Sequence, residues 1–488
     1  MKKTVINKIY DLSVNLPNRS ALIANNNSIT YERLWILVSG FSNYLKINKI
    51  HEGSNIIVRC SQTISYIVTY LASQLSGTVF IPTDKNISNN ELLSLAQKTE
   101  CSCIITTDVN LICSALLINS ADVEKIGQEN YCNTVNFNFP YDDFPSDILF
   151  TTGTTGASKG VILSHKAVSA VAENLTNCLS MNGNTTLLVN GPLNHAYSLR
   201  RVYACLSAGG CTVILDGLVS LKDFFYSLEN YSVNALALVP SALRTILKLT
   251  GEKISEYKNQ ILFIESATSP LLESDKESIM KYLPNTDLYN IYGSSESGTV
   301  TGYNYKKHPG LVNCVGKPLI NSHIIIVDSQ RNEIQSSPRN TGFIACKGDI
   351  NMSGYYKDDD LTNEVMSSGY VYTNDIGYIE DGFVFITGRL GDVINIGGLK
   401  VSPTEVESAV LELDSIVDCI CIAKKDSVAG SILQLLYSTR DNEDIDIAYI
   451  KNHLRVKLES YKIPRLFERA KEIKHTFNGK PDRKFYVQ

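Results

Sequence analysis

The sequence has no run of 18 apolar residues and no excess of basic side chains. The first absence argues against a membrane-spanning helix. The near balance of 45 basic and 50 acidic residues argues against a nucleic-acid surface, which needs a positive field. The basic start breaks its apolar run with Asn7 and Lys8, so it does not resemble a signal peptide. Low-complexity segments and long repeats are also missing, and we expect a globular cytoplasmic chain.

The twelve cysteines lack the spacing of metal or redox sites. Cys101 with Cys103, and Cys419 with Cys421, are separated by one residue, whereas zinc knuckles and redox motifs have two. The second pair lies in a mostly apolar, strand-like run. We therefore predict buried structural thiols in a reducing compartment.

The 488 residues are too many for one ordinary hydrophobic core. Strand-like runs over 54–60 and 77–84 flank a predicted helix over 64–77 that Gly77 closes. Further short strands follow, and this order favours a mostly parallel sheet covered by helices. After about residue 320 the pattern changes to hairpins, the clearest with its turn at Asp381-Gly382.

A polar, glycine-rich stretch over 388–400 resembles a linker. After it, Ser402 is the predicted N-cap of a helix, with Pro403 at the first helical position and Glu405 completing a capping box. A small final domain is therefore expected to begin near residue 392.

The segment TTGTTGASKG, residues 151–160, is rich in hydroxyl groups and glycine. A strand is predicted over 146–150 and a helix over 164–179 with Ser164 as N-cap, so we expect a loop between strand and helix. Glycines permit close backbone approach, and exposed N–H groups, hydroxyls and Lys159 can bind oxyanions. This pattern indicates phosphate binding, although it is not the Walker A pattern. A flexible polar surface loop is the alternative.

The segment matches [ST]-[ST]-G-[ST]-T-G-x-x-K-G and resembles the nucleotide loop of the acyl-adenylate-forming superfamily. That superfamily contains acyl- and aryl-CoA synthetases, adenylation domains of nonribosomal peptide synthetases, and luciferases. Four further segments resemble its motifs in the same order: LYNIYGSSESG at 288–298, YVYTNDIGYI at 370–379, residues 386–407, and FNGKPDRKFY at 477–486.

The resemblance implies a role for each matched residue. Tyr292 would stack on adenine, Asp375 and Arg389 would bind the ribose, and Glu296 would hold Mg²⁺. Residues 264–271, IESATSPL, occupy the place of the family segment that covers adenine, so Ser266, Ala267 and Thr268 are candidates there. Lys480 would be the catalytic lysine, placed between the attacking carboxylate and the α-phosphate. The full set of implied ATP-binding residues is Thr151, Thr152, Gly153, Thr154, Thr155, Gly156, Lys159, Ser266, Ala267, Thr268, Asn290, Ile291, Tyr292, Gly293, Ser294, Ser295, Asp375 and Arg389.

Gly391 stands where the family usually carries Asp or Lys as the hinge of the small domain, and Gly397 and Gly398 match a glycine pair beside the thiol tunnel. Ser295 replaces the usual threonine and keeps its hydroxyl. Asn374 replaces a glycine and tolerates left-handed backbone. A catalytically silent homologue is one alternative that these departures leave open.

Residues 191–201, GPLNHAYSLRR, resemble the segment that borders the acid pocket. His195 and Tyr197 are candidate pocket residues, although a core histidine is nearly as good an interpretation of His195. The aspartate usual in amino-acid-activating members is missing, which favours an uncharged aliphatic or aromatic carboxylate. Tyr203, Arg200 and Arg201 are candidates to bind a second polar group on the acid. The alternative, which we favour, is that the two arginines lie at the surface in ion pairs.

The implied fold is α/β: a large N-terminal domain, residues 1–390, with layered α/β sheets and a β-barrel-like subdomain, and a small mobile α/β C-terminal domain, residues 391–488. The implied reaction is activation of an organic acid by ATP and Mg²⁺ as acyl-AMP, with release of pyrophosphate. Transfer to coenzyme A follows. Loading of the phosphopantetheine arm of a carrier protein is the alternative acceptor, and a nucleotidase or kinase is an alternative function.

Overall fold

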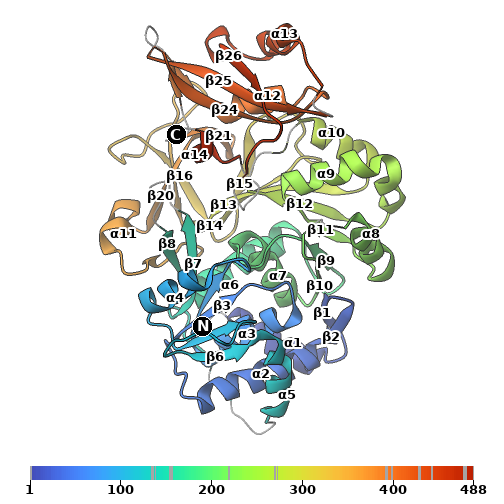
Figure 1. Ribbon diagram of the computed structural model, residues 1–488, viewed down its shortest axis with the longest axis vertical. Helices are drawn as coiled ribbons and strands as arrows, with labels where there is room; N and C mark the ends of the chain where they lie inside the picture. Colours follow the sequence, from blue (N-terminus) through green and yellow to red (C-terminus); the bar gives the residue numbers. More distant parts are fainter. Residues whose placement is uncertain are drawn as a thin grey trace.

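The computed structural model describes residues 3–132, 137, 139–152, 158–217, 220–268, 271, 273–390, 394–396, 399–426, 430–440, 443–475 and 481–486 of the 488. Its N-terminal and central segments form a large α/β body, and the last hundred residues form a small body at one end (Figure 1). The predicted α/β fold class is confirmed.

The longest sheet has fourteen strands and changes character along its width. Strands β1, β10, β9, β11, β12 and β13 are parallel, while the pairs from β13 onward are antiparallel. The change falls near residue 298, where hairpins replace strand–helix–strand units. The strands in spatial order are β16 (His323–Val327), β17 (Gly342–Lys347), β20 (Tyr370–Glu380), β21 (Phe383–Arg389), β15 (Cys314–Pro318), β14 (Gly298–Asn304), β13 (Asp287–Ser294), β12 (Phe263–Ala267), β11 (Ala235–Ala237), β9 (Thr186–Val189), β10 (Cys211–Ile214), β1 (Ser20–Ala24) and β2 (Asn27–Thr30), with β19 (Met366–Ser367) beside β20.

A second sheet of seven strands carries the hydroxyl-rich segment. It is parallel from β6 to β7 and ends in two antiparallel pairs. Its strands in spatial order are β18 (Gly354–Tyr355), β8 (Ser158–Ser164), β7 (Pro145–Thr152), β4 (Val79–Thr83), β3 (Asn55–Arg59), β5 (Cys103–Thr106) and β6 (Leu116–Asn119).

Helices cover both faces of each large sheet, because both faces are apolar. In β9, Leu187 and Val189 join the main core while Leu188 joins the core on the other face. Such strands, buried on both faces, appear as continuous apolar runs in sequence. The helices of this body are α1 (Val5–Asn15), α2 (Tyr31–Ile47), α3 (Ile64–Ser76), α4 (Asn89–Lys98), α5 (Val123–Glu129), α6 (His165–Cys178), α7 (Ala196–Ser207), α8 (Leu221–Asn230), α9 (Pro240–Thr250), α10 (Glu273–Tyr282) and α11 (Asp359–Val365).

The layers follow from which helices share each core. Helices α2, α3, α6 and α7 pack between the two sheets, where the main core contains side chains from both. Helices α8, α9 and α10 cover the outer face of the long sheet, and α4 covers the outer face of the other. The predicted strands and the helix over 64–77 are present, and Gly77 ends α3 with a φ of 73°.

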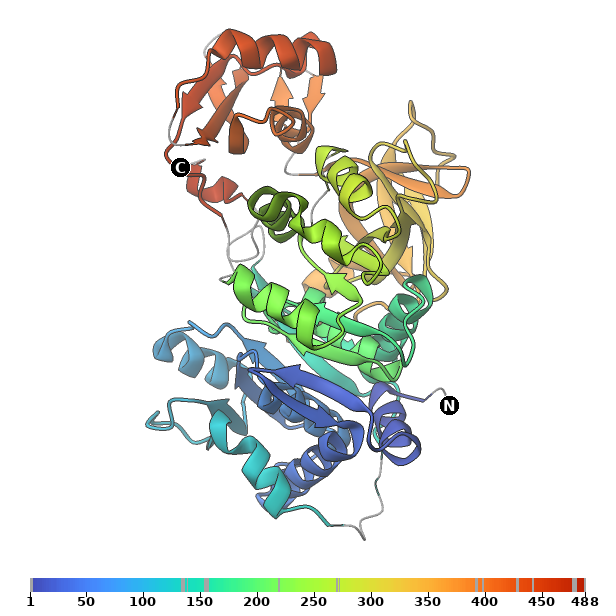
Figure 2. The same ribbon diagram turned by 90° about the vertical axis from the view of Figure 1, so that its right-hand side faces the viewer.

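The small C-terminal body has its own core. It contains the sheet β24 (Ile416–Asp426), β25 (Gly430–Thr439) and β26 (Leu466–Arg469), the hairpin β22 (Ile394–Ile396) and β23 (Leu399–Val401), and helices α12 (Pro403–Val410), α13 (Ile447–Lys457) and α14 (Arg483–Tyr486). Figure 2, turned by 90°, shows this body at one end of the molecule. The stretch predicted as a linker therefore carries a short hairpin.

Two local predictions are corrected by the structure. The hydroxyl-rich segment does not lead directly into a helix: Thr151 and Thr152 end β7, and Ser158 to Gly160 begin β8, so it joins two antiparallel strands. The predicted capping box of α12 is also absent. Ser402 makes no side-chain cap bond, and Glu405 instead accepts a hydrogen bond from Lys462.

The predicted burial of the two closely spaced cysteine pairs is confirmed. No disulfide joins the twelve cysteines, all of which lie in the described segments, and Cys101, Cys103, Cys419 and Cys421 are buried. Burial raises the pKa of Cys101 to about 11. Among the described residues there is no group of three or more potential His, Cys, Asp or Glu metal ligands. None of the helices in these segments has the length and apolar character needed to cross a membrane.

Candidate active site

The residues predicted to bind adenine and ribose meet where β13 approaches β20 and β21. The Tyr292 hydroxyl donates a hydrogen bond to Asp375 Oδ2 at 2.7 Å. Asp375 and Arg389 are direct cross-strand partners, with Arg389 Nε 3.6 Å from Asp375 Oδ1. Burial, and then the charge of Asp375, raise the pKa of Tyr292 well above its usual value. Three residues separated by up to 97 positions thus form one cluster.

Ser266, Ala267 and Thr268 lie beside that cluster at the carboxyl end of β12. Parallel pairing places Ser266 next to Asn290 and Ala267 next to Ile291. Thr268 has a φ of 78°, a left-handed conformation that is costly for a β-branched residue. Such strain is common at ligand-binding positions, and here it falls in the segment predicted to cover adenine.

The phosphate side of the site is built on the hairpin of β7 and β8. Thr151 pairs with Lys159 across the hairpin. Thr151 lies four positions after Asp147, which is buried in β7. Gly153, Thr154, Thr155 and Gly156 lie outside the described residues, as does the side chain of Thr152. The hairpin therefore places Lys159 at the base of the predicted phosphate loop.

Glu296 lies against this hairpin through Tyr355, a residue that the sequence did not single out. The Tyr355 hydroxyl donates to Glu296 Oε1 at 3.0 Å, and the Lys159 ammonium lies 5.6 Å from the centre of the Tyr355 ring. Burial, and then Glu296, raise the pKa of Tyr355 above its usual value. A single carboxylate of this kind fits Mg²⁺, which is usually held by one or two carboxylates together with substrate phosphates.

The turn from Ser294 to Ser297 positions Glu296. The Ser297 N–H donates to Ser294 Oγ at 2.9 Å, and Gly293 approaches the backbone of Gly298 too closely to allow a side chain. Arg200 of α7 donates to the carbonyl oxygens of Ser294 and Ser295 at 2.9 and 3.1 Å. No motif of the sequence indicates this contact, because its acceptors are backbone oxygens 94 and 95 positions away.

The interpretation of Arg200 and Arg201 as a surface ion pair is wrong. Both residues are buried, with only 5% and 3% of their surface exposed. Arg201 donates to both carboxylate oxygens of Glu265 in β12, at 3.0 and 2.5 Å. A buried guanidinium needs such partners because isolated charges are costly to bury.

The two predicted acid-pocket residues lie at the start of α7. Tyr197 is buried, and its hydroxyl donates to Glu265 Oε2 at 3.0 Å. His195 immediately precedes the helix, and burial lowers its pKa. Tyr197 therefore contacts the buried Arg201–Glu265 pair. Glu265 directly precedes Ser266, the first of the three residues predicted to cover adenine.

Four predicted residues cannot be placed. Lys480, Gly391, Gly397 and Gly398 lie outside the described residues. Arg483, three positions after Lys480 and in α14, donates to Glu407 of α12. This bond holds α14 against the rest of the small body.

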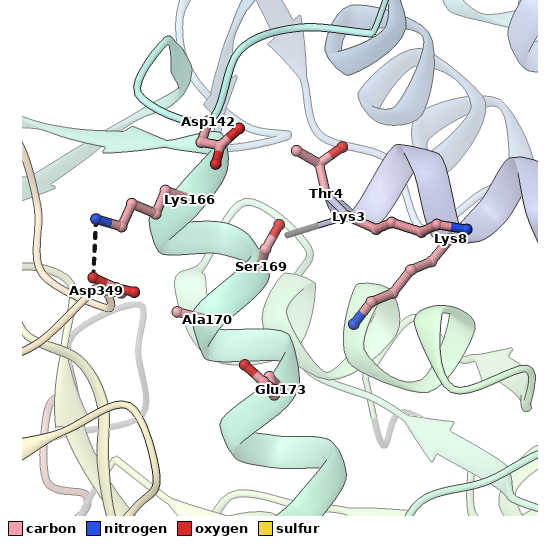
Figure 3. Close-up of a pocket in the computed structure, with 9 residues that line it drawn as sticks. All are labelled: Lys3, Thr4, Lys8, Asp142, Lys166, Ser169, Ala170, Glu173 and Asp349. Atoms are coloured by element: carbon pink, nitrogen blue, oxygen red, sulfur yellow. Dashed lines mark ion pairs between the residues drawn. The ribbon is translucent and has the colours of Figure 1, made fainter. Parts of the chain in front are cut away.

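A separate hollow, lined by other residues, lies elsewhere in the described structure. It has a volume of about 440 Å³ and lies between α1 and α6, where Lys166 pairs with Asp349 at 3.0 Å (Figure 3). None of the predicted site residues lines it.

Family models decide the relationship of the chain. Residues 13–356 match the AMP-binding enzyme model, and residues 405–480 match the model of the AMP-binding enzyme C-terminal domain. The first match covers well over half of the sequence. The chain belongs to the AMP-binding enzyme family.

Members of the AMP-binding enzyme family resemble it along nearly its whole length. A medium/long-chain-fatty-acid–CoA/3-oxocholest-4-en-26-oate–CoA ligase of Mycolicibacterium smegmatis is 25% identical, over 96% of this chain and 93% of that protein. The 4-coumarate–CoA ligase 1 of Petroselinum crispum is 25% identical, over 85% and 81%. The ATP-bound MatB of Rhodopseudomonas palustris has the same fold, with a TM-score of 0.90 and 20% identity over 100% and 98%.

Proposed function

We propose that the protein activates an organic carboxylic acid with ATP as an acyl adenylate, releases pyrophosphate, and transfers the acyl group to coenzyme A. One observation carries the proposal: a single segment, residues 292–296, brings Tyr292 to Asp375 and Arg389 and brings Glu296 to the hairpin of Lys159. The residues proposed to bind the nucleoside and those proposed to bind the phosphates thus lie at the two ends of one turn, as one bound nucleotide requires.

In the first half-reaction, an acid carboxylate attacks the α-phosphorus of ATP, and pyrophosphate leaves. Both reactants are anions, so cations must offset their repulsion. Lys159 is placed beside the phosphates, and Lys480 is the group proposed at the reacting centre. Asp375 and Arg389 hold the ribose and keep the α-phosphate at a fixed distance from the acid.

Mg²⁺, when bound at Glu296, would offset charge on the leaving phosphates. Tyr355 holds the carboxylate of Glu296 in one orientation by donating to one oxygen, which leaves the other for the ion. The hydroxyls of the loop after Thr151, together with Ser295, are proposed to bind the remaining phosphate oxygens.

In the second half-reaction, the thiolate of coenzyme A attacks the acyl carbon, and AMP leaves. We propose residues 1–390 and 391–488 as the two units that move relative to each other, with Gly391 as the hinge. Gly397 and Gly398 would then face the thiol, because glycines allow its narrow arm to approach the backbone. The names of the relatives, which are CoA ligases, favour coenzyme A over a carrier protein.

The acid is proposed to carry no charge other than its reacting carboxylate. The charge of Arg201 is offset by Glu265, and the hydroxyl of Tyr197 is already bonded to the same carboxylate. These three residues therefore offer no unpaired charge to a second ionic group on the acid. Aliphatic and aromatic monocarboxylates suit this environment, and the names of the relatives include both types.

The tests are pyrophosphate exchange into ATP and hydroxylamine trapping of the acyl adenylate with release of AMP, across a panel of aliphatic, aromatic and dicarboxylic acids, each repeated with coenzyme A. We expect pyrophosphate exchange into ATP that depends on a monocarboxylate, and a thioester when coenzyme A is added. ATP hydrolysis without any dependence on an acid would instead identify a nucleotidase.

A further inference from the structure

Arg200 is a buried cation that the proposed chemistry does not use. It lies in the middle of α7, and its two terminal nitrogens donate to two consecutive backbone carbonyls, those of Ser294 and Ser295. These carbonyls belong to the turn that carries Glu296. The planar fork of a guanidinium presents a separate nitrogen to each carbonyl, whereas an ammonium group would have to reach both from a single nitrogen.

Carboxyl groups from two other elements influence Arg200. Burial lowers the pKa of Arg200, whereas the carboxyl groups of Glu296 on the turn and Asp147 on β7 act to raise it. Arg201, the adjacent cation, is offset by Glu265. Arg200 therefore lies between the strand that leads into the phosphate loop and the carboxylate proposed to bind the metal.

A carboxylate that binds a metal through one oxygen must be held in place before the metal arrives, because each misplacement weakens binding. Tyr355 fixes one side of Glu296, and the turn fixes its backbone. Without Arg200, the carbonyls of Ser294 and Ser295 would lose their side-chain donor, and the turn could rotate.

We infer that Arg200 is a positioning residue for the metal-binding carboxylate of Glu296. The inference rests on the proposed function, since it assumes that Glu296 contacts the ion bound to ATP. It assigns Arg200 to the metal and terminal phosphates, and not to the adenine, the ribose or the acid.

The matched control is Arg59. Its guanidinium also donates to a backbone carbonyl, that of Ile87 at 2.6 Å, and it also binds Asn89 at 3.0 Å. In both arginines the Nε atom is buried without a hydrogen-bond partner. Arg59 contacts no predicted site residue in these bonds, so Arg59→Met measures the cost of losing such an arginine in itself.

The experiment compares Arg200→Met, Arg200→Lys and Arg59→Met by isothermal titration with MgATP, with ATP in EDTA, and with AMP. For Arg200→Met we expect the gain in ATP affinity that Mg²⁺ provides to fall about tenfold, the usual scale for losing a hydrogen bond to a charged group. AMP affinity should stay within about twofold. Arg200→Lys should fall between wild type and Arg200→Met, and Arg59→Met should leave all three affinities unchanged.

The kinetic readout is the KM for MgATP in pyrophosphate exchange, which should rise while the KM for the acid does not. Equal losses of AMP and MgATP affinity, or wild-type MgATP binding by a folded Arg200 variant, would overturn the inference. If Arg200→Met does not fold, Arg200→Lys carries the test.

The two proposals fail in different ways. If wild-type protein shows no acid-dependent exchange, the proposed function fails, whatever the binding data show. If wild-type protein exchanges pyrophosphate normally and the Arg200 variants bind MgATP as wild type does, only the role of Arg200 is rejected.

Discussion

The side chain of Tyr292 has two separate parts in the site. Its ring is proposed to stack on adenine, and its hydroxyl holds Asp375 at 2.7 Å. Asp375 is also within 3.6 Å of Arg389. The hydroxyl and the guanidinium together define where the carboxylate can meet a ribose.

Tyr292→Phe should therefore weaken ATP binding without removing the stacking surface. We expect the KM for ATP to rise about fivefold to tenfold, because a hydrogen bond to a charged group is lost. The KM for the acid should not change.

Tyr289→Phe is the matched control for this change. Tyr289 lies on the same strand, and its hydroxyl donates to Asp287 at 3.3 Å. Steady-state kinetics with ATP and acid varied separately provide the measurement. A similar rise for both variants would mean that the effect is general to β13.

The motifs of the sequence were enough to select Tyr292, Asp375 and Arg389 as candidates, and the structure brings these three residues together. It failed for Arg200 and Arg201 because the partners that bury them are distant in sequence. Glu265 lies 64 positions from Arg201, and the carbonyls of Ser294 and Ser295 leave no trace in residue type. Two adjacent arginines are expected to lie at the protein surface unless buried partners for their charges are known.

Strand β7 carries a carboxylate in the interior of the protein. Burial raises the pKa of Asp147 to about 7, although Ser146, Tyr70 and Arg200 partly offset this rise. The folded protein therefore binds a proton more tightly at this residue than the unfolded chain does. This contribution to stability decreases as the pH rises from about 4 to about 7, and stays low above that.

Asp147→Asn should remove this dependence. The variant should gain thermal stability relative to wild type at pH 8, by several degrees, and gain less at pH 5. Melting curves across this pH range test the prediction. A constant difference at all pH values would contradict it.

His165, at the start of α6, has the opposite effect in part of the same range. Burial lowers its pKa to about 4, so the folded state loses stability as the pH falls from about 6.5 to 4. The comparison must therefore be made between Asp147→Asn and wild type at each pH, where the contribution of His165 cancels.

Two helices test the effect of capping within one chain. Ser164 caps α6 by accepting a hydrogen bond from the Ala167 N–H, whereas Ser402 makes no such bond to α12. Ser164→Ala should lower the free energy of unfolding by about 1 kcal/mol. Ser402→Ala should cost clearly less. Urea unfolding followed by circular dichroism measures both, and equal costs would contradict the observed geometry.

These helices also show what local sequence can predict. Both N-termini were predicted correctly, because serine before an apolar periodic run is a strong signal. The capping box failed because Glu405 has a competing partner, Lys462, 57 positions away. The hairpin of β7 and β8 was not predicted, because Ser158, Lys159 and Gly160 continue the polar pattern of the loop and give no sign that a strand begins there.

For the whole molecule, the order of elements was enough to predict the α/β class and the large and small bodies. The change from parallel strands to hairpins was also visible in the sequence. The pairing order of fourteen strands was not, since it depends on crossovers between distant segments. The same holds for the seven-stranded sheet, in which residues 354–355 pair with β8.

Movement of the small body should separate the two half-reactions. We expect Lys480→Ala to abolish acyl-adenylate formation and to leave thiolysis of supplied acyl adenylate largely intact, because the lysine is needed only where two anions meet. Single-turnover assays of each half-reaction measure this. Lys474→Ala, in the same terminal segment, is the control, since that lysine pairs with Glu472 within the small body.

Equal loss of both half-reactions in Lys480→Ala would reject this division between the two steps. Normal adenylation in the variant would reject the assignment of the lysine itself.

Strand β18 has a mechanical consequence for the site. Its backbone pairs with β8 at Gly354 and Tyr355, while the Tyr355 side chain holds Glu296. A shift of the hairpin is therefore transmitted through one side chain to the carboxylate. The groups proposed to bind the terminal phosphates and the carboxylate proposed to bind their metal ion would then move together, so that the two binding affinities rise and fall together.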